Sequence, residues 1–261
     1  MNNEVPTSEF VKKLRRPSSF TLSFFLVVAR VRFNAWFEYF GVANEDRLPT
    51  DIEGKPLIVF LNHASWWDPL PMLLLQMKFL PGRFVCAPSD AAALTQASHL
   101  RMIGFFPVDT GTFGGTKRFL RDCDHILAIP EAVLCITPEG EFRDPRARPL
   151  ELRRGLAALL ARTGSVTVLP LAIEYTIWDK RRPEMLASWG EPIQIEDGRS
   201  KSVDEWQTVL TDSLTATLDE LADHSIKREK WRFRPLIYGP MGRRNTMQLI
   251  SDIKSIFRHR L

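Results

Sequence analysis

Apolar stretches long enough for a buried strand recur along the chain, and segments of helical character separate them. The apolar runs are PLIVFL, RFVCA, FFPV, AVLCIT and VTVLPLAI. Helical patterns occupy residues 70–77, 91–102, 116–129 and 150–162, and an amphipathic pattern over 203–222 predicts a closing helix. This alternation is typical of an α/β fold with a mostly buried central sheet flanked by helices. We therefore predict a single α/β domain over residues 57–226.

The N-terminal residues 1–41 carry another apolar stretch, FTLSFFLVVARV, preceded by KKLRR. No small-x-small cleavage site follows it, so a signal peptide is not indicated. Arg30 and Arg32 interrupt the stretch, and a spanning helix needs about 20 largely apolar residues. Aromatic side chains and flanking arginines favour a helix lying at a membrane interface, with an ordinary helix docked on the domain as the alternative. Residues 42–56 are polar and rich in turn formers, which predicts a linker.

Charge is distributed unevenly along the chain. The net charge is +4, yet residues 227–261 alone carry ten Lys/Arg against two Asp/Glu and interleave them with Trp231, Phe233 and Tyr238. This basic, aromatic tail predicts contact with anionic lipid headgroups or an acidic carrier protein; a plain solvated surface is the alternative, and nucleic acid is not expected. The three cysteines form no CxxC pair, which indicates a reducing compartment and neither a disulfide framework nor a zinc site.

Candidate chemistry begins with NHASWWDP, residues 62–69, directly after the first apolar run of the domain. His63 and Asp68 would point about 140° apart on a continuous helix, so they would not meet there. If the run is a strand and Pro69 opens a helix, the loop between them can fold His63 back towards Asp68. Histidine is the usual general base near neutral pH and needs a carboxylate to orient it. A simple helix N-cap is the alternative role for Asp68.

Two further turns follow apolar strands, TPEGEFR at residues 137–143 and IGFFPVDTG at residues 103–111. Ligands in α/β domains gather where strands end and helices begin. We therefore expect these turns and NHASWWDP to converge on one edge of the sheet.

Together these motifs resemble those of the glycerolipid acyltransferase family, of the lysophosphatidate acyltransferase type. The NHxxxxD motif is met by Asn62, His63 and Asp68. The second motif is met by Gly104, Phe105, Phe106 and Val108, with Thr110 where the family has arginine. The third, FPEGTRS, is met by Pro138, Glu139 and Gly140, with Glu141 and Phe142 in place of threonine and arginine. The fourth, an apolar-proline-apolar strand, is met by Leu169, Pro170, Leu171 and Ile173.

The resemblance implies transfer of a fatty acyl group to a lipid hydroxyl, as in phospholipid biosynthesis, at the cytoplasmic face of a membrane. His63 would be the general base and Asp68 would orient it. The acceptor would be held by Glu139, Gly140, Arg143, Gly104 and Thr110, with Asn62, Pro138 and Pro170 in support. The donor would be acyl-CoA or acyl carrier protein, and no metal or other cofactor is implied. Ser65 lacks a G-x-S-x-G context, so it is not predicted to be a nucleophile.

The departures from the family motifs bear on the acceptor. Arginines that end the second motif and lie within the third look like phosphate ligands in the family, and both are replaced here. Arg143, one position later, could substitute, as could Lys117, Arg118, Arg153 or Arg154, for which a solvated helix-face charge is the alternative. A lysophosphatidate remains a candidate acceptor, and a non-phosphate lipid such as a glycolipid fits the missing arginines better. A noncatalytic lipid-binding protein and an acyl thioesterase are the alternative functions, and the sequence indicates no oligomeric state.

Overall fold

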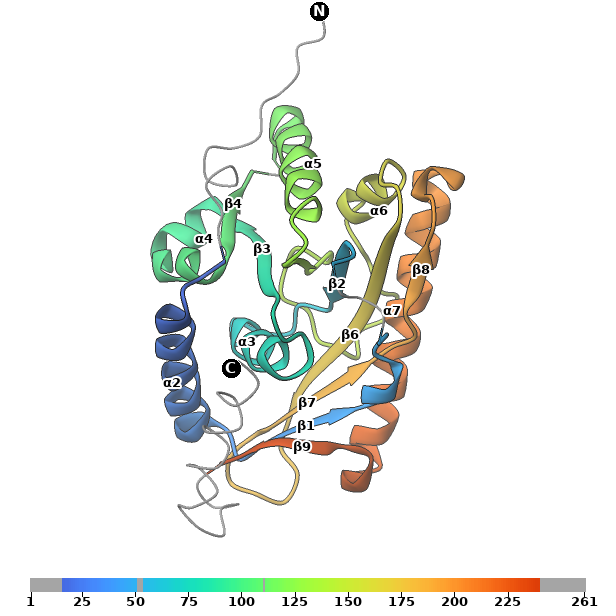
Figure 1. Cartoon of the computed structure of the whole chain (residues 1–261). Coiled ribbons are helices and arrows are strands. Elements are labelled where there is room, and N and C mark those ends of the chain that lie inside the picture. Colours follow the sequence, from blue (N-terminus) through green and yellow to red (C-terminus); the bar gives the residue numbers. More distant parts are fainter. Residues whose placement is uncertain (1–15, 51–53, 110, 240–261) are drawn as a thin grey trace, which may run out of the picture.

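A mixed nine-stranded sheet forms the centre of the computed structural model, which describes residues 16–50, 54–109 and 111–239 (Figure 1). Its strands are β1 (Tyr39–Ala43), β2 (Leu57–Leu61), β3 (Phe84–Asp90), β4 (Phe105–Val108), β5 (Ala132–Ile136), β6 (Val166–Thr176), β7 (Glu184–Trp189), β8 (Ile193–Ile195) and β9 (Arg234–Tyr238). They are ordered β4-β3-β5-β2-β6-β7-β1-β9, and β8 pairs with β6. The predicted α/β class is therefore confirmed.

Helices alternate with the strands, although two predicted segments differ: 91–102 divides into a short helix and a 3-10 turn, and only 155–160 of 150–162 is an α-helix. The helices are α2 (Ser19–Trp36), α3 (Pro69–Phe79), α4 (Ala91–Gln96), α5 (Phe113–Leu127), α6 (Gly155–Leu160) and α7 (Val203–Ile226). Short 3-10 turns are η1 (Glu45–Arg47), η2 (Ser98–Ile103), η3 (Gly198–Ser200) and η4 (Lys230–Arg232). Helix α7 begins with a capping box, in which Ser202 and Glu205 bond each other's backbone N–H groups.

Five adjacent strands, β4, β3, β5, β2 and β6, run parallel. In this register Val59 of β2 lies between Cys135 of β5 and Leu169 of β6. Because the carboxyl ends of parallel strands share one edge, the turns after β2 and β5 emerge next to each other. This arrangement gives the two predicted loops, NHASWWDP and TPEGEFR, a common location.

Helices cover both faces of the sheet (Figure 1), and each face carries its own hydrophobic core. On one face α5, α6 and α7 supply residues such as Phe119, Leu159 and Leu214. On the other face α2 and α3 supply residues such as Phe33 and Leu75. Strand β2 contributes to both, since alternate residues point to opposite faces and all five of its residues are buried. The site at its carboxyl end therefore rests on a rigid base.

The predicted N-terminal helix is α2, which begins after the N-cap Ser18. One face docks on the domain through Leu22, Phe25, Ala29 and Phe33. Among the residues that the structure describes, no helix combines the length and the apolar content needed to cross a membrane. The interfacial position predicted for this segment is taken up below as a proposal.

The structure draws two sequence-based boundaries differently. Strand β1 crosses the predicted boundary between the N-terminal segment and the linker at 41/42, and it lies inside the sheet between β7 and β9 with every residue buried. Strand β9, within the predicted tail 227–261, pairs with β1. Both strands are short, and YFGVA of β1 shows no alternation of apolar and polar residues. The sequence therefore does not mark β1 as a strand, and β1 forms through hydrogen bonds to strands distant in the chain. Residues 1–15 and 240–261 lie outside the described residues.

Candidate active site

His63 and Asp68 meet at the carboxyl end of β2. Pro69 is the first residue of α3, and the loop before it folds back so that Nδ1 of His63 lies 2.7 Å from Oδ2 of Asp68. The imidazole is 26% exposed and the carboxylate 5%, so a substrate can reach the ring while the acid stays covered. With a carboxylate as acceptor, Nδ1 carries the proton, which leaves Nε2 as the basic nitrogen.

The Asp68 carboxylate does not cap α3. No hydrogen bond joins it to the first turn of the helix. Instead Oδ2 also accepts from the backbone N–H of Ser65 at 3.3 Å, and Oδ1 accepts from the hydroxyl of Tyr175 at 2.8 Å. The capping alternative considered for Asp68 is thus replaced by a network aimed at His63.

Tyr175 is a member of the site that the sequence motifs did not indicate. It lies near the end of β6, which runs parallel to β2. Burial, followed by the nearby charge of Asp68, raises the pKa of the Tyr175 phenol well above its ordinary value. The hydroxyl therefore stays protonated and donates to Asp68. Its position two residues beyond Ile173 of the fourth motif is the only sequence signal that could have found it.

Asn62 and Pro170 support this loop from the sheet. The Asn62 side chain donates from Nδ2 to the carbonyl of Ile173 at 2.9 Å and accepts at Oδ1 from the N–H of Ile173 at 2.8 Å. It thereby extends the β2–β6 pairing past the end of β2 with a side chain. Pro170 pairs with Phe60 in register and accepts from the N–H of Gly190 at 2.9 Å.

The third motif clamps the backbone of His63. Oε2 of Glu139, a buried side chain, accepts from the His63 N–H at 2.5 Å, and the Arg143 N–H donates to the His63 carbonyl at 2.9 Å. Burial raises the pKa of Glu139, and the bond from the His63 N–H opposes this rise. The TPEGEFR turn therefore fixes the peptide groups on both sides of the candidate base.

Gly140 and Pro138 shape that turn. Gly140 has φ = 70°, in the left-handed region, and a Cβ there would lie 2.3 Å from Nε of Arg153. The Arg153 N–H donates to the Pro138 carbonyl at 2.7 Å. The Arg153 guanidinium thus covers the glycine, and any larger residue at position 140 would displace it.

Phe142 and Arg143 lie where the acceptor-binding charge was expected. The Phe142 ring centroid is 4.4 Å from that of His63, and the side chain is 58% exposed. The Arg143 guanidinium lies 2.8 Å from Glu141 and 2.8 Å from Glu151. The residues next to His63 are therefore an aromatic ring and an arginine whose charge two carboxylates already balance.

The second motif ends at the same edge of the sheet, because β4 is parallel to β2, but it lies three strands to the side. Gly104 precedes β4, and β3 and β5 separate β4 from β2, so strand spacing alone puts it roughly 14 Å away. Its φ is 105°, and a Cβ would lie 1.9 Å from the Val85 carbonyl oxygen, which gives it a local backbone role. Thr110, the other predicted acceptor residue of this motif, lies outside the described residues.

The part of the basic tail that the structure describes is balanced by acids. Its five cations are each within ion-pair distance of a carboxylate: Lys227–Asp223, Arg228–Asp179, Lys230–Glu184, Arg232–Glu229 and Arg234–Glu45. Phe233 is buried, whereas Trp231 is exposed. Each described cation of this stretch therefore has a carboxylate partner within the protein.

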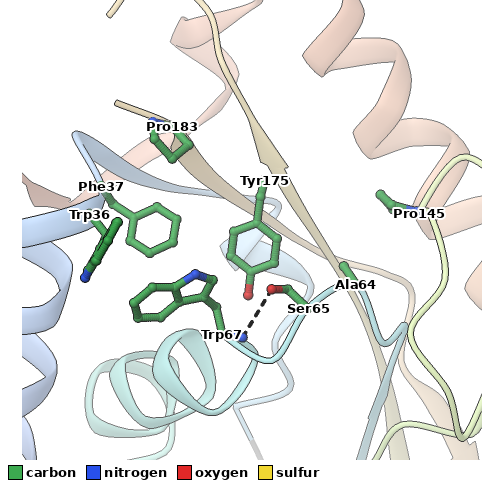
Figure 2. Close-up of a pocket in the computed structure, with 8 residues that line it drawn as sticks. All are labelled: Trp36, Phe37, Ala64, Ser65, Trp67, Pro145, Tyr175 and Pro183. Carbon is green, nitrogen blue, oxygen red and sulfur yellow. Dashed lines mark hydrogen bonds between the residues drawn. The ribbon is translucent and has the colours of Figure 1, made fainter. Parts of the chain in front are cut away.

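A cleft of about 340 Å³ lies next to the His63–Asp68 pair, since Ala64, Ser65 and Tyr175 line it. Figure 2 shows its lining residues. Four of its eight lining residues are aromatic: Trp36, Phe37, Trp67 and Tyr175. Its walls come from the end of α2 and the residue after it, the NHASWWDP loop, the segment between β5 and α6, the end of β6 and the loop before β7. Tyr175 and Ser65, both bonded to Asp68, belong to the wall.

Fold and site together define an α/β enzyme with a buried acid holding a reachable histidine at the carboxyl end of a parallel strand. Comparison with protein families matches the chain to the family described as Acyltransferase over residues 40–174, just over half of its length. The chain belongs to this family, the glycerolipid acyltransferases, and is an acyltransferase. A search of curated proteins found no match.

Proposed function

We propose that this acyltransferase is membrane-associated and transfers a fatty acyl group from acyl-CoA or acyl carrier protein to a lipid hydroxyl. The observation that carries the proposal is the bond between Nδ1 of His63 and Oδ2 of Asp68, with Nε2 left as the base on a ring that solvent reaches. Catalysis at this pair needs no metal or further cofactor, because the thioester is already activated.

In this reaction Nε2 of His63 takes the proton of the acceptor hydroxyl while its oxygen attacks the thioester carbonyl carbon. The imidazolium that forms lies against the Asp68 carboxylate, which stabilises its charge. Collapse of the tetrahedral intermediate breaks the C–S bond, and the imidazolium returns the proton to the leaving thiolate. An ester and a free thiol result, and the histidine is regenerated.

For the acceptor we favour a lipid that presents an uncharged group next to its hydroxyl, such as a glycolipid, over a lysophospholipid. Phe142 contacts the His63 ring, and Glu141 and Glu151 balance the charge of Arg143. A phosphate bound there would displace those carboxylates or sit against an aromatic face, and both arrangements are costly for an anion.

The outer face of α2 supports membrane association. Opposite its docked face lies a stripe of exposed apolar residues, Phe20, Phe24, Val27 and Val31, and the helix ends at the exposed Trp36. Both faces of this helix are apolar although only one packs on the domain, and such a second face fits the boundary between headgroups and acyl chains. Arg32, which is exposed, is placed to reach the headgroups, whereas the Arg30 guanidinium donates to the Tyr238 carbonyl.

The proposal is tested by incubating the purified protein with a radiolabelled acyl thioester and total membrane lipid, then identifying products by mass. A new acyl lipid that depends on His63 supports transfer and names the acceptor. Free fatty acid as the sole product would indicate hydrolysis and overturn the proposal. Running acyl-CoA and acyl carrier protein in parallel identifies the donor.

A further inference from the structure

The cleft beside Asp68 is lined mostly by apolar side chains, although it adjoins a charged pair. No charged side chain lines it. The Tyr175 hydroxyl donates to Asp68. The Ser65 oxygen accepts from the Trp67 N–H at 3.2 Å (Figure 2). The remaining surface is mostly aromatic rings and prolines.

These walls suit hydrocarbon better than a polar group. For a phosphate or a sugar entering the cleft, the donors among the lining side chains are the Ser65 hydroxyl and the indole N–H groups of Trp36 and Trp67, and no lining side chain carries a charge. Each hydroxyl of a sugar left unpaired there costs about 1–3 kcal/mol by protein mutational data. An alkyl chain has nothing to leave unpaired and gains from every methylene that leaves water. The volume of about 340 Å³ is near the lower limit for ligand pockets, which fits part of one chain.

The cleft also joins the reacting groups to the face proposed to meet the membrane. At one end Ala64 directly follows His63. At the other end Trp36 closes α2, and its ring lies 6.1 Å from that of Trp67. A lipid drawn from a bilayer beside α2 would pass Trp36 first and reach His63 last.

We propose that this aromatic cleft, lined by Trp36, Phe37, Trp67, Tyr175 and Pro183, binds the hydrocarbon chain of the acceptor lipid and so presents its hydroxyl to His63. The proposal rests on the proposed function and assigns a subsite within it. Tyr175 forms part of the cleft wall, and its hydroxyl donates to Asp68. A chain bound in the cleft therefore packs against the ring of Tyr175, which holds the carboxylate that orients His63.

The test uses short 1-alkylglycerols, each one methylene longer than the last, at concentrations below micelle formation so that the chain is transferred from water. Wild-type kcat/KM for the acceptor should rise by up to about fourfold per methylene until the cleft is full. Pro183→Trp, which fills the end remote from His63, should stop this rise at shorter chains. Its longest acceptors should lose at least about tenfold relative to wild type, and this loss should grow with chain length.

Ile177→Trp is the matched control, since Ile177 is exposed in the loop that leads to Pro183 and does not line the cleft. It should keep the wild-type dependence on chain length. The same dependence in Pro183→Trp as in Ile177→Trp would overturn the proposal. So would a Pro183→Trp defect that follows the length of the donor acyl chain instead, because the cleft would then hold the donor.

Binding without turnover separates this subsite from the proposed function. In calorimetric titrations with the same alkylglycerols and no thioester, wild type and Ile177→Trp should bind more tightly with each methylene, with a negative heat-capacity change. Pro183→Trp should lose that gain. If wild type transferred no acyl group to any acceptor, the proposed function would fail, and these titrations would still decide the cleft: equal affinities along the series would refute it.

Discussion

Replacing Tyr175 by phenylalanine isolates the contribution of one hydroxyl to the His63–Asp68 pair. The Tyr175 hydroxyl donates to Oδ1 of Asp68 at 2.8 Å in a buried setting, and the change keeps the ring against Phe37. A hydrogen bond to a charged group contributes about 1.5–3 kcal/mol. If that amount is lost when the imidazolium forms beside a carboxylate that is no longer held, kcat falls by about 10- to 100-fold. The KM of donor and acceptor should change little.

Tyr39→Phe is the matched control. Its hydroxyl is also buried and donates to the Phe233 carbonyl at 2.9 Å, on the face of the sheet covered by α7. Both variants should lower the melting temperature, by about 2–4 °C per kcal/mol lost. Only Tyr175→Phe should lower kcat, measured at saturating thioester and acceptor. Equal kcat values for the two variants would refute the claim that Tyr175 positions Asp68.

Four further predictions concern the other groups of the site and of α2. His63→Ala should lower kcat by about two to four orders of magnitude with an unchanged circular dichroism spectrum, since a general base contributes that much; a folded variant with near-normal turnover would contradict the assignment. Glu139→Gln should weaken the pH dependence of stability, measured as melting temperature against pH. Burial raises the pKa of Glu139 in the folded protein, so the folded protein keeps this proton to higher pH than the unfolded chain does. Wild type therefore loses stability as the pH rises from the unfolded-state pKa to the folded-state pKa. The glutamine does not titrate, and its amide oxygen still accepts from the His63 N–H. Phe142→Arg should raise kcat/KM for phosphate-bearing acceptors relative to uncharged ones by about tenfold or more, because it adds a guanidinium beside the His63 ring; an unchanged ratio would remove Phe142 from acceptor selection. Phe24→Ser, on the exposed stripe of α2, should weaken sedimentation with lipid vesicles at little cost in melting temperature, and Phe33→Ala, on the docked face, should instead cost about 3–5 kcal/mol of stability.

The local sequence determined the parts of the fold whose partners lie close in the chain. Buried runs such as LIVFL of β2 specify strands because they are apolar on both faces, and Pro69 specifies the start of α3 because its fixed φ suits a first helical turn. The return of His63 to Asp68 follows from these two boundaries, since the seven residues 62–68 between the end of β2 and the start of α3 leave few other paths. The family motifs could be recognised in the sequence because each one lies within a single short segment of the chain.

Long-range packing decided the rest. YFGVA carries no alternation that marks a strand, and β1 forms because β7 and β9, both more than 130 residues away, supply its hydrogen-bond partners. The bonds from Tyr175 to Asp68 and from the His63 N–H to Glu139 join residues 107 and 76 positions apart. The pairing of Arg143 with Glu151 and the contact of Phe142 with His63 depend on how the turn after β5 folds over the loop after β2. A sequence pattern records which residues a segment can bury, but the partner of each buried polar group is set only when distant segments meet.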